Sequence, residues 1–374
     1  MKVLILTVTA GGGHNSTASA IQTCFEKRGI DCRVLDAYLN VNRGLYSLIS
    51  KGYLLSTADF KKTYAYFYAK LEKRRSNSYS TSFTRTAYGM FRKKMLAAID
   101  EYQPDVIVYT HVFAGIMLDV LDQRSPLQVR TIGVLTDFAM HPFWEETLRT
   151  DRVVIPNEML IPAALRKGLR EEQIAPIGIP IRPQFSERVD RAEARRHFGL
   201  AEDRTTLLLM GGSMGYGSIA ETLADLDALP NPMQILCVCG SNQKAKEEID
   251  GMTFRHTVKN FGYTDEVSLM MDAADCIVTK PGGLTTSEAL AKRLPMVICN
   301  PIPGQEDRNT EFLLNNGAAV RVSKTSRLSD VIYQLFLYPN RIELMKQNID
   351  LIRKPNATEN LADLAEMLAA EKRT

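Results

Sequence analysis

The chain has 374 residues, of which 45% are hydrophobic and 24% charged, and its formal net charge is +3. This composition is that of a folded globular protein and excludes a disordered chain, and the length predicts two domains of ~100–200 residues each. The six cysteines have no zinc-type spacing, which indicates a reducing, cytoplasmic compartment, and no apolar run reaches the ~18 residues of a transmembrane helix.

The first ten residues, MKVLILTVTA, predict a buried parallel strand because they are apolar and β-branched almost throughout. A turn of three glycines that ends at Gly13 follows, then His14, and residues 17–28 have the apolar spacing of a helix. One interpretation is a dinucleotide-binding turn, with Asp36 at the end of the next strand holding a ribose. That fingerprint requires a glycine where Ser16 stands, which disfavours it.

Residues 38–99 have a different composition from the rest of the chain. They contain twelve of the Lys and Arg residues against Asp59 and Glu72, and twelve of the 28 Phe and Tyr residues. Cationic side chains mixed with aromatic ones are typical of an anionic membrane surface, and RNA attracts the same mixture. No RNA-binding motif accompanies the segment, which favours the membrane over nucleic acid. A solvated basic helical insertion is the structural alternative. Candidate membrane residues are Tyr64, Phe67, Arg74 and Arg75.

Two further apolar strands are predicted at residues 104–110 and 129–135, and polar residues follow both. His111 follows the first, and the second leads into TDFAMHPFW, which contains Asp137, His141 and Trp144. Because the carboxyl ends of parallel strands meet at one edge of a sheet, these residues are expected to face the same crevice as His14. A lone His or Asp at a strand end is also common for purely structural reasons. Strands at 152–156 and 174–181 close the domain, and the prolines around residue 180 predict a stiff linker.

A second strand, glycine turn and helix are predicted at residues 205–226. Free N–H groups at a helix start bind anions, and glycine allows close approach, so this turn is typical of phosphate binding. It lacks the Lys and Ser/Thr of a nucleoside triphosphatase loop. The turn contains Gly212, Ser213, Met214 and Gly215.

The stretch from residue 274 to 316 combines a short strand, a glycine turn at Gly282 and Gly283, a helix, a second strand and a polar loop. Thr285 and Glu288 have the spacing of a capping box, which would give Glu288 a structural role. The polar loop that contains Gln305 and Glu306 follows the second strand. Loops at the carboxyl ends of strands hold ligands in open α/β sheets, so this stretch predicts half of a ligand site.

The order Gly-Gly, Thr/Ser-rich turn, Glu-Ala, Pro-led strand and Pro-x-x-Gly-Gln-Glu resembles the donor half of glycosyltransferase family 28. This family includes the diacylglycerol glycosyltransferases, the monogalactosyldiacylglycerol synthases and the related lipid II-forming GlcNAc transferase. The turn GGGH and the segment TDFAMHPFW resemble the acceptor-side signatures of the diacylglycerol branch. The resemblance covers nearly the whole chain and is weak at residues 38–100.

The resemblance implies roles for named residues. His14 corresponds to the general base, with Asp137 as an orienting or polarising residue, and Gly13, His141 and Trp144 lie on the acceptor side. Glu288 corresponds to the ribose ligand, and Gln305 and Glu306 to ligands of the transferred sugar. The remaining donor-binding residues implied are the diphosphate turn 212–215, the uracil-flanking Phe261, Gly262 and Tyr263, and the turn residues Gly282, Gly283 and Thr285. No metal or other cofactor is expected, because backbone N–H groups near Ser213 stabilise the leaving UDP.

The implied fold is α/β, of the GT-B type, with two Rossmann-like domains facing each other across a cleft. The expected boundaries are 1–175 for the acceptor and membrane-binding domain, with its insertion at about 38–100, and 176–184 for the linker. Residues 185–350 form the UDP-sugar domain, and 351–374 a C-terminal helix that crosses back to the first domain by fold analogy.

The implied function is inverting transfer of glucose from UDP-glucose to 1,2-diacylglycerol, and onward to the glucolipid, by a peripheral enzyme on the cytoplasmic face of the membrane. The expected partners are the UDP-sugar, diacylglycerol and anionic lipids, without nucleic acid. Alternatives are a UDP-galactose-dependent synthase, a UDP-GlcNAc transferase acting on a polyprenyl diphosphate lipid, and a non-catalytic UDP-sugar sensor on the membrane. The sequence does not choose glucose over galactose, nor does it determine the number of sugars added.

Overall fold

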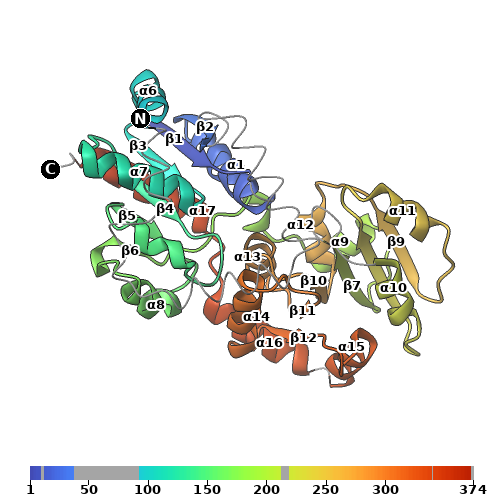
Figure 1. Ribbon diagram of the computed structural model, residues 1–374. Helices are drawn as coiled ribbons and strands as arrows, with labels where there is room; N and C mark the ends of the chain where they lie inside the picture. Colours follow the sequence, from blue (N-terminus) through green and yellow to red (C-terminus); the bar gives the residue numbers. More distant parts are fainter. Residues whose placement is uncertain (10–11, 38–91, 212–218, 339, 372–374) are drawn as a thin grey trace. The chain divides into compact units, whose positions relative to one another are not determined.

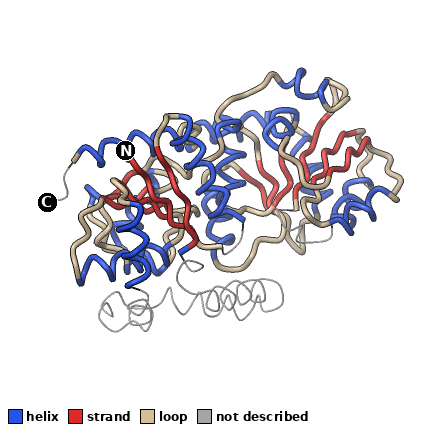
Figure 2. Tube along the Cα trace, turned by 90° about the horizontal axis from the view of Figure 1, so that it is seen from above, coloured by secondary structure: helices blue, strands red, loops and turns tan. Residues whose placement is uncertain are grey.

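The structure is a computed structural model, and it describes residues 1–9, 12–37, 92–211, 219–338 and 340–371. The chain divides into two compact units (Figure 1). The first contains Met1–Pro183, Pro303–Gln305 and Asn356–Thr374, and the second contains Gln184–Ile302 and Glu306–Pro355. Each unit is an α/β domain with its own parallel sheet, and Figure 2 shows helices on both sides of each group of strands.

The first unit contains a six-stranded parallel sheet in the order β2-β1-β3-β4-β5-β6. Its strands are β1 (Lys2–Thr7), β2 (Asp31–Asp36), β3 (Val106–Tyr109), β4 (Arg130–Val134), β5 (Arg152–Val154) and β6 (Ile174–Ala175). Its α-helices are α1 (Gly12–Lys27), α6 (Arg92–Tyr102), α7 (Val112–Arg124), α8 (Ile161–Arg166) and α17 (Ala357–Ala370), and short 3-10 helices are η1 (Pro142–Glu146), η2 (Glu158–Leu160) and η3 (Glu171–Gln173).

The central strands of the first sheet are buried because both faces are covered by helices. Val3, Ile5, Val106 and Val108 are 0% exposed and form one core cluster with α1 and with α17. The predicted strand at 174–181 is much shorter in the structure, where β6 ends at Ala175. Pro176 follows immediately, and proline has no N–H to continue the ladder.

The last helix packs on the first unit, and in Figure 1 its red ribbon lies among the elements of that unit. Leu361 and Leu368, each at most 1% exposed, enter the core cluster beside Ile21 and Phe25 of α1. The hydroxyl of Thr358 also donates to the carbonyl of Ile181 (2.6 Å) and accepts from its N–H (2.9 Å). A segment that is remote in sequence therefore completes the first domain.

The second unit contains another six-stranded parallel sheet, in the order β12-β11-β10-β7-β8-β9. Its strands are β7 (Thr205–Met210), β8 (Met233–Val238), β9 (Thr257–Phe261), β10 (Cys276–Thr279), β11 (Met296–Ile298) and β12 (Ala319–Arg321). The α-helices that accompany them are α9 (Arg191–His197), α10 (Ile219–Asp227), α11 (Gln243–Asp250), α12 (Val267–Ala273), α13 (Gly283–Ala291), α14 (Gln305–Asn315), α15 (Leu328–Leu337) and α16 (Asn340–Ile352). This strand order is that of the Rossmann fold.

Both sheets have a topological switch point, where the direction of strand succession reverses. In the first unit it lies between β1 and β3, and in the second between β7 and β10. Ligands of open α/β sheets bind outside the carboxyl ends of the strands at such a point. The loops after β1, β3 and β4 in the first unit, and after β7, β10 and β11 in the second, are therefore the candidate ligand-binding loops.

Candidate active site

His14 lies at the amino end of α1, directly beyond the carboxyl end of β1. The helix was expected to begin near residue 17, but it begins at Gly12, so His14 is its third residue. The first N–H groups of a helix have no partner within the helix, and the helix dipole is positive there. The imidazole therefore stands at an electropositive helix start, half-buried, at the switch point of the first sheet.

A polar network joins the start of α1 to the ends of β1 and β2. The Asp36 carboxylate accepts hydrogen bonds from the N–H (2.9 Å) and the hydroxyl (2.7 Å) of Thr9. Asn15 joins this loop to β1 by donating to Thr9 Oγ1 (3.1 Å) and accepting from Thr7 Oγ1 (3.0 Å). Asp36 thus holds Thr9, just after β1, in place of the ribose contact that the dinucleotide interpretation requires.

The hydrogen bonds of His14 determine its tautomer. Nδ1 lies 2.7 Å from the carbonyl oxygen of Thr110 and 3.2 Å from Thr136 Oγ1. A carbonyl oxygen only accepts, so Nδ1 carries the proton and Nε2 keeps a lone pair. The Thr110 carbonyl is therefore an orienting partner of the ring, and the orienting or polarising role of Asp137 stays a prediction. Asp137 is 9% exposed and follows Thr136 in the chain, and its contact with a substrate stays a prediction.

Two more histidines lie near His14, and both have the opposite tautomer. His111 is the N-cap of α7, and its Nδ1 accepts from the N–H of Phe113 (3.2 Å). His141 is the N-cap of η1, and its Nδ1 accepts from the N–H of Phe143 (3.2 Å). A backbone N–H only donates, so each Nδ1 is unprotonated and each neutral ring has its proton on Nε2. The ring centres of His14 and His111 are 4.5 Å apart, at an angle of 61°.

Burial keeps all three imidazoles neutral. Loss of water contact lowers the pKa of His14 from 6.5, although its hydrogen bond to Thr110 opposes this shift. Burial lowers the pKa of His111 well below 6.5, and the neighbouring His14 and His141 lower it further. Burial also lowers the pKa of His141 to about 4, with Lys167 and His14 contributing. The cluster therefore offers one unprotonated nitrogen on His14 and a neutral N–H donor on His111, and His141 adds no positive charge.

Aromatic side chains surround the histidines. The rings of Phe113 and Phe143 have centres 5.5 Å apart, and each also contacts its capping histidine, at 5.0 and 5.2 Å. Both phenyl rings are half-buried, so the cluster has an apolar side. Trp144 is only 2% exposed and stacks on Tyr109 at 5.9 Å. It supports the site from within the core, and direct contact of Trp144 with an acceptor stays a prediction.

In the second unit a small hollow of about 30 Å³ lies at the carboxyl ends of β7, β10 and β11. It is lined by residues from the ends of the three strands and from α10, namely Leu209, Met210, Gly211, Ile219, Thr222, Val278, Thr279, Lys280, Cys299 and Asn300. This is the switch point of the second sheet. The predicted diphosphate residues Gly212, Ser213, Met214 and Gly215 follow Gly211 and lie outside the described residues.

The glycine turn after β10 starts α13 without a side-chain cap. Gly282 is the N-cap and Gly283 the first helical residue, and no side chain caps the N-terminus. The predicted capping box of Thr285 and Glu288 is therefore wrong, because both residues lie inside the helix. A Cβ at Gly282 would meet nothing within 4 Å, so this backbone is accessible to a ligand. Glu288 is 4% exposed, and its contact with a ribose stays a prediction.

The polar loop after β11 contains the predicted sugar ligands Gln305 and Glu306. Both are half-buried and begin α14, and Glu306 Oε2 accepts from the N–H of Ile302 (2.6 Å). Asn309, one turn further on, is 0% exposed and donates to the carbonyl of Pro281 (2.8 Å). Asn309 thus ties α14 to the glycine turn after β10. The sequence gives no signal for this contact, because a single Asn inside a helix has no distinguishing pattern.

Phe261 ends β9, and Gly262 and Tyr263 follow it at the carboxyl edge of the sheet. Phe261 packs edge-on against Phe198 at 5.9 Å and is half-buried, whereas Tyr263 is 74% exposed. Their contact with a base stays a prediction. The membrane candidates Tyr64, Phe67, Arg74 and Arg75 lie outside the described residues.

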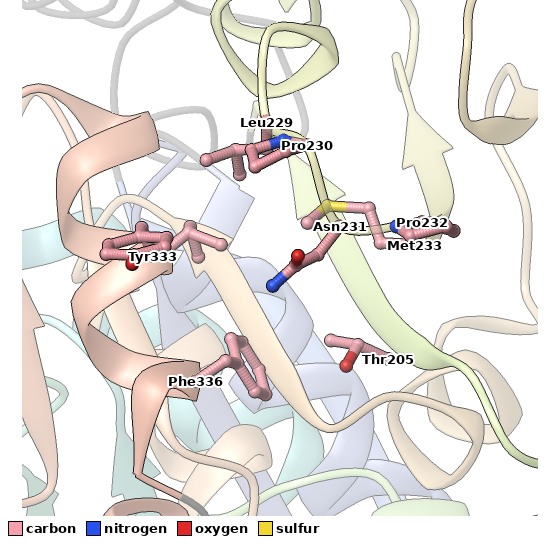
Figure 3. A pocket seen from close by; sticks show the side chains of 9 residues that line it. Thr205, Leu229, Pro230, Asn231, Pro232, Met233, Tyr333 and Phe336 are labelled. Carbon is pink, nitrogen blue, oxygen red and sulfur yellow. The ribbon is translucent and has the colours of Figure 1, made fainter.

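A larger hollow of about 270 Å³ lies elsewhere in the second unit, at the amino ends of β7 and β8. In Figure 3, Tyr333 and Phe336 of α15 face the segment from Leu229 to Met233 across this hollow. It opens at the edge of the sheet opposite to the glycine turns and contains no charged side chain. Its position and composition separate it from the candidate active site.

The described part of the chain contains no group of three or more His, Cys, Asp or Glu side chains that could hold a metal ion. None of its helices is both long and apolar enough to span a bilayer.

His111 is the main site residue that the sequence does not reveal. It was expected only to face the crevice at a strand end, whereas the structure places it in ring contact with His14. Thr110 and Thr136, which hold the His14 ring, were not assigned either. All three residues lie at or just beyond the carboxyl end of a parallel strand, and this position is the one sequence feature that could have identified them.

Two family models match the chain, one in each unit. Residues 14–181 match the monogalactosyldiacylglycerol (MGDG) synthase model, and residues 206–367 match the C-terminal domain of glycosyltransferase family 28. The first match begins at His14 itself. The second includes both glycine turns and the polar loop.

Relatives match over nearly the full length. The chain is 27% identical over 365 residues to the processive diacylglycerol beta-glucosyltransferase of Bacillus pumilus (strain SAFR-032), covering 97% of this chain and 94% of that protein. It is also 27% identical over 379 residues to the protein of that name from Bacillus subtilis (strain 168), covering 100% and 97%.

Among solved structures, MurG of Acinetobacter baumannii has the same fold, with a TM-score of 0.68 and 16% identity over 98% of this chain and 99% of that one. The two Rossmann-like units therefore have the GT-B fold. The chain therefore joins a first unit of the monogalactosyldiacylglycerol synthase type to a C-terminal domain of glycosyltransferase family 28.

Proposed function

We propose that the chain transfers glucose from UDP-glucose to the free hydroxyl of 1,2-diacylglycerol with inversion at sugar carbon C1, and then onward to the glucosyl-diacylglycerol formed. The observation that carries this proposal is the histidine cluster at the switch point of the first sheet. There, His14 Nδ1–H is held by the Thr110 carbonyl, which leaves Nε2 available as a base. The names of the full-length Bacillus relatives support the choice of donor sugar and acceptor.

In this mechanism His14 Nε2 accepts the proton of the acceptor hydroxyl while its oxygen attacks C1 from the face opposite to the leaving group. A bond forms between that oxygen and C1, and the bond between C1 and the phosphate oxygen breaks. UDP leaves with the electron pair. A neutral imidazole is suited to this step, because general base catalysis requires the unprotonated form at working pH.

The donor side uses the second unit. We assign the diphosphate to the glycine turn after β7 and the start of α10, where free N–H groups and the helix dipole favour an anion. Glu288 is assigned to the ribose, and its position inside α13 leaves it no capping role. Gln305 and Glu306 are assigned to the sugar hydroxyls. With backbone N–H groups stabilising UDP, no metal is required in the proposal.

The neutral histidines favour an uncharged acceptor over a polyprenyl diphosphate. His111 and His141 have pKa values well below 6.5, so neither ring carries positive charge at neutral pH. The phenyl rings of Phe113 and Phe143 beside them suit an apolar molecule. A diphosphate lipid needs cationic partners to compensate its charge. The alternative acceptor is therefore the weaker hypothesis.

We propose further that the enzyme binds the cytoplasmic face of the membrane as a peripheral protein. The support is the lipid acceptor named for the relatives and the basic, aromatic composition of residues 38–99. The six cysteines, all free, fit a reducing compartment. Contact of this segment with anionic lipid is the expected consequence.

The proposal is tested by transfer from radiolabelled UDP-glucose, UDP-galactose and UDP-GlcNAc to diacylglycerol in anionic vesicles, with the lipid products separated. We expect a labelled glucolipid, and a ladder of products if transfer is repeated. His14→Ala is expected to lower kcat by about 100-fold or more while UDP still binds, because it removes the general base. His197→Ala removes an exposed histidine of the second unit and serves as the matched control.

Labelled product from UDP-galactose alone would change the donor assignment. No product from any donor, with UDP binding intact, would favour the polyprenyl acceptor first and the sensor interpretation second. A His14→Ala variant with wild-type kcat would remove His14 from the role of base.

A further inference from the structure

We propose that His111 binds the acceptor hydroxyl together with His14, so that the hydroxyl donates its proton to His14 Nε2 and accepts a hydrogen bond from His111 Nε2–H. This inference rests on the proposed function and identifies a second acceptor-binding residue of the same site. It follows from the opposite tautomers of two imidazoles that are in ring contact.

The Nε2 atoms of His14 and His111 have complementary hydrogen-bonding roles. His14 Nδ1 is used by the Thr110 carbonyl, and His111 Nδ1 is used by the N–H of Phe113. Within the described part of the chain, neither Nε2 has a hydrogen-bond partner. One open nitrogen is therefore an acceptor and the other a donor. A hydroxyl group has one proton to donate and lone pairs to accept, so it satisfies both at once.

The two rings are also close enough to share one bound oxygen. An oxygen that makes two hydrogen bonds of about 2.8 Å can join nitrogens up to about 5.6 Å apart. The His14 and His111 ring centres are 4.5 Å apart, so the two rings are close enough for their Nε2 atoms to fall within this span. The rings meet at 61°, in an edge contact rather than a parallel stack. One oxygen atom can therefore contact both rings.

The neutral charge state of His111 also fits this role. His111 cannot take the proton in place of His14, because its Nδ1 lone pair is used and its ring is held neutral by burial. A neutral donor also avoids repulsion with the imidazolium that forms on His14 when it accepts the proton. His111 is thus suited to hold the oxygen and to stabilise the negative charge that develops on it, while His14 alone changes its protonation state.

The structural alternative is that His111 only caps α7. Serine and asparagine are both better N-caps than histidine, so replacing His111 with either preserves the cap on Phe113 N–H. The two variants differ in the hydrogen-bond donor that they leave for a substrate. The serine hydroxyl is too short to replace the distant Nε2–H, whereas the asparagine amide keeps an N–H donor. The pair His111→Ser and His111→Asn therefore separates capping from acceptor binding.

The experiment measures transfer to diacylglycerol by the full chain with the donor sugar that the wild type uses. For His111→Ser we expect kcat/KM for diacylglycerol to fall about tenfold, because one hydrogen bond to the acceptor is lost. The KM for the sugar nucleotide and the melting temperature should not change. His111→Asn is expected to recover part of this loss. His197→Asn, at an exposed position of the second unit, is the control.

Two results would overturn the inference: kcat/KM of His111→Ser within twofold of the wild type, or His111→Asn no more active than His111→Ser. If His111→Ser does not fold, judged by melting and by UDP binding, His111→Asn is compared with His111→Asp. Both cap the helix, and only asparagine donates. Equal activity of these two would then contradict the inference. A wild-type protein inactive on every lipid hydroxyl would instead refute the proposed function, before any variant is compared.

Discussion

At the scale of single residues, the chemistry of the site is set by main-chain groups that hold side chains in one protonation state. The Thr110 carbonyl selects one tautomer of His14, and the N–H groups of Phe113 and Phe143 select the other for His111 and His141. Each of these backbone groups lies at a strand end or a helix start, where it has no partner in the regular structure. The ends of regular elements therefore decide which ring nitrogen keeps a lone pair and which carries the proton.

The first prediction at this scale concerns the pH dependence of transfer. The base must be neutral, and burial lowers the pKa of His14 from 6.5. The value of kcat/KM is therefore expected to be constant above pH 6.5 and to fall only as the pH drops through the lowered pKa of His14. The profile is measured over the range in which the melting temperature does not change. An acid limb centred above pH 6.5 would contradict the assignment.

A second prediction concerns acid stability. The pKa of His141 falls from 6.5 to about 4 on folding, so below pH 6.5 the unfolded chain binds a proton that the folded chain does not. The free energy of unfolding therefore decreases as pH falls from 6.5 to about 4, by up to about 3 kcal/mol from this residue. His141→Asn keeps an N-cap and removes this contribution, so it is expected to lose less stability in acid.

The measurement is urea unfolding at pH 7 and near pH 4.5, followed by the fluorescence of Trp144, the single tryptophan of the chain. Trp144 belongs to η1, the helix that His141 caps, and it is 2% exposed. A variant that loses as much stability in acid as the wild type would show that His141 does not titrate as described.

At the scale of elements, the docking of α17 on α1 shows which contacts stabilise the first unit. Arg28 makes ion pairs with Glu359, Asp363 and Glu366, but these carboxylates are 48–67% exposed. Exposed ion pairs contribute about 0.2–1 kcal/mol each, whereas truncating a buried leucine costs about 2–5 kcal/mol. The apolar face of α17, rather than its charges, is expected to dominate.

The prediction is that Leu361→Ala destabilises the protein by about 2–5 kcal/mol and Arg28→Ala by about 1 kcal/mol. Leu361 is 1% exposed and belongs to the core cluster of the first unit. Met367→Ala, at a position of α17 that is 47% exposed, is the matched control and should change little. The quantity measured is the free energy of unfolding in urea. A larger cost for Arg28→Ala than for Leu361→Ala would reverse this ranking.

At the scale of the whole molecule, the two units differ in how the chain builds them. The second unit spans residues 184–355 with only Pro303–Gln305 grouped elsewhere, whereas the first needs both ends of the chain. A fragment of residues 184–355 retains all six strands of its sheet and its core cluster. It is therefore expected to fold alone, to unfold cooperatively and to bind UDP.

A fragment of residues 1–183 is expected to be less stable than one to which residues 356–374 are rejoined, because it exposes the α1 surface that α17 covers. Circular dichroism melting and calorimetric UDP binding of the fragments test both statements. A 184–355 fragment without a cooperative transition would show that the second unit depends on the first.

Much of the secondary structure followed from the residues alone. The strands at 205–210 and 233–238 have in the structure the bounds that their apolar, β-branched runs predict. The GT-B fold was also implied correctly, through the two glycine turns and the resemblance that they carry. Errors concentrated at helix starts. The capping box at Thr285 and the late start of α1 were both wrong, because glycine turns before a helix leave its first residue unmarked by a side chain.

The sequence by itself determined the two α/β units, the switch-point loops and His14, because periodicity and glycine turns are local properties of the chain. Only the tertiary structure decided that His111 lies in ring contact with His14, that Thr110 holds its Nδ1 and that α17 completes the first core. These contacts join residues about 100 to 350 positions apart, as in Thr110 with His14 and Leu361 with Ile21. Which loops meet depends on strand order, and strand order is a property of the packed sheet rather than of any stretch of sequence.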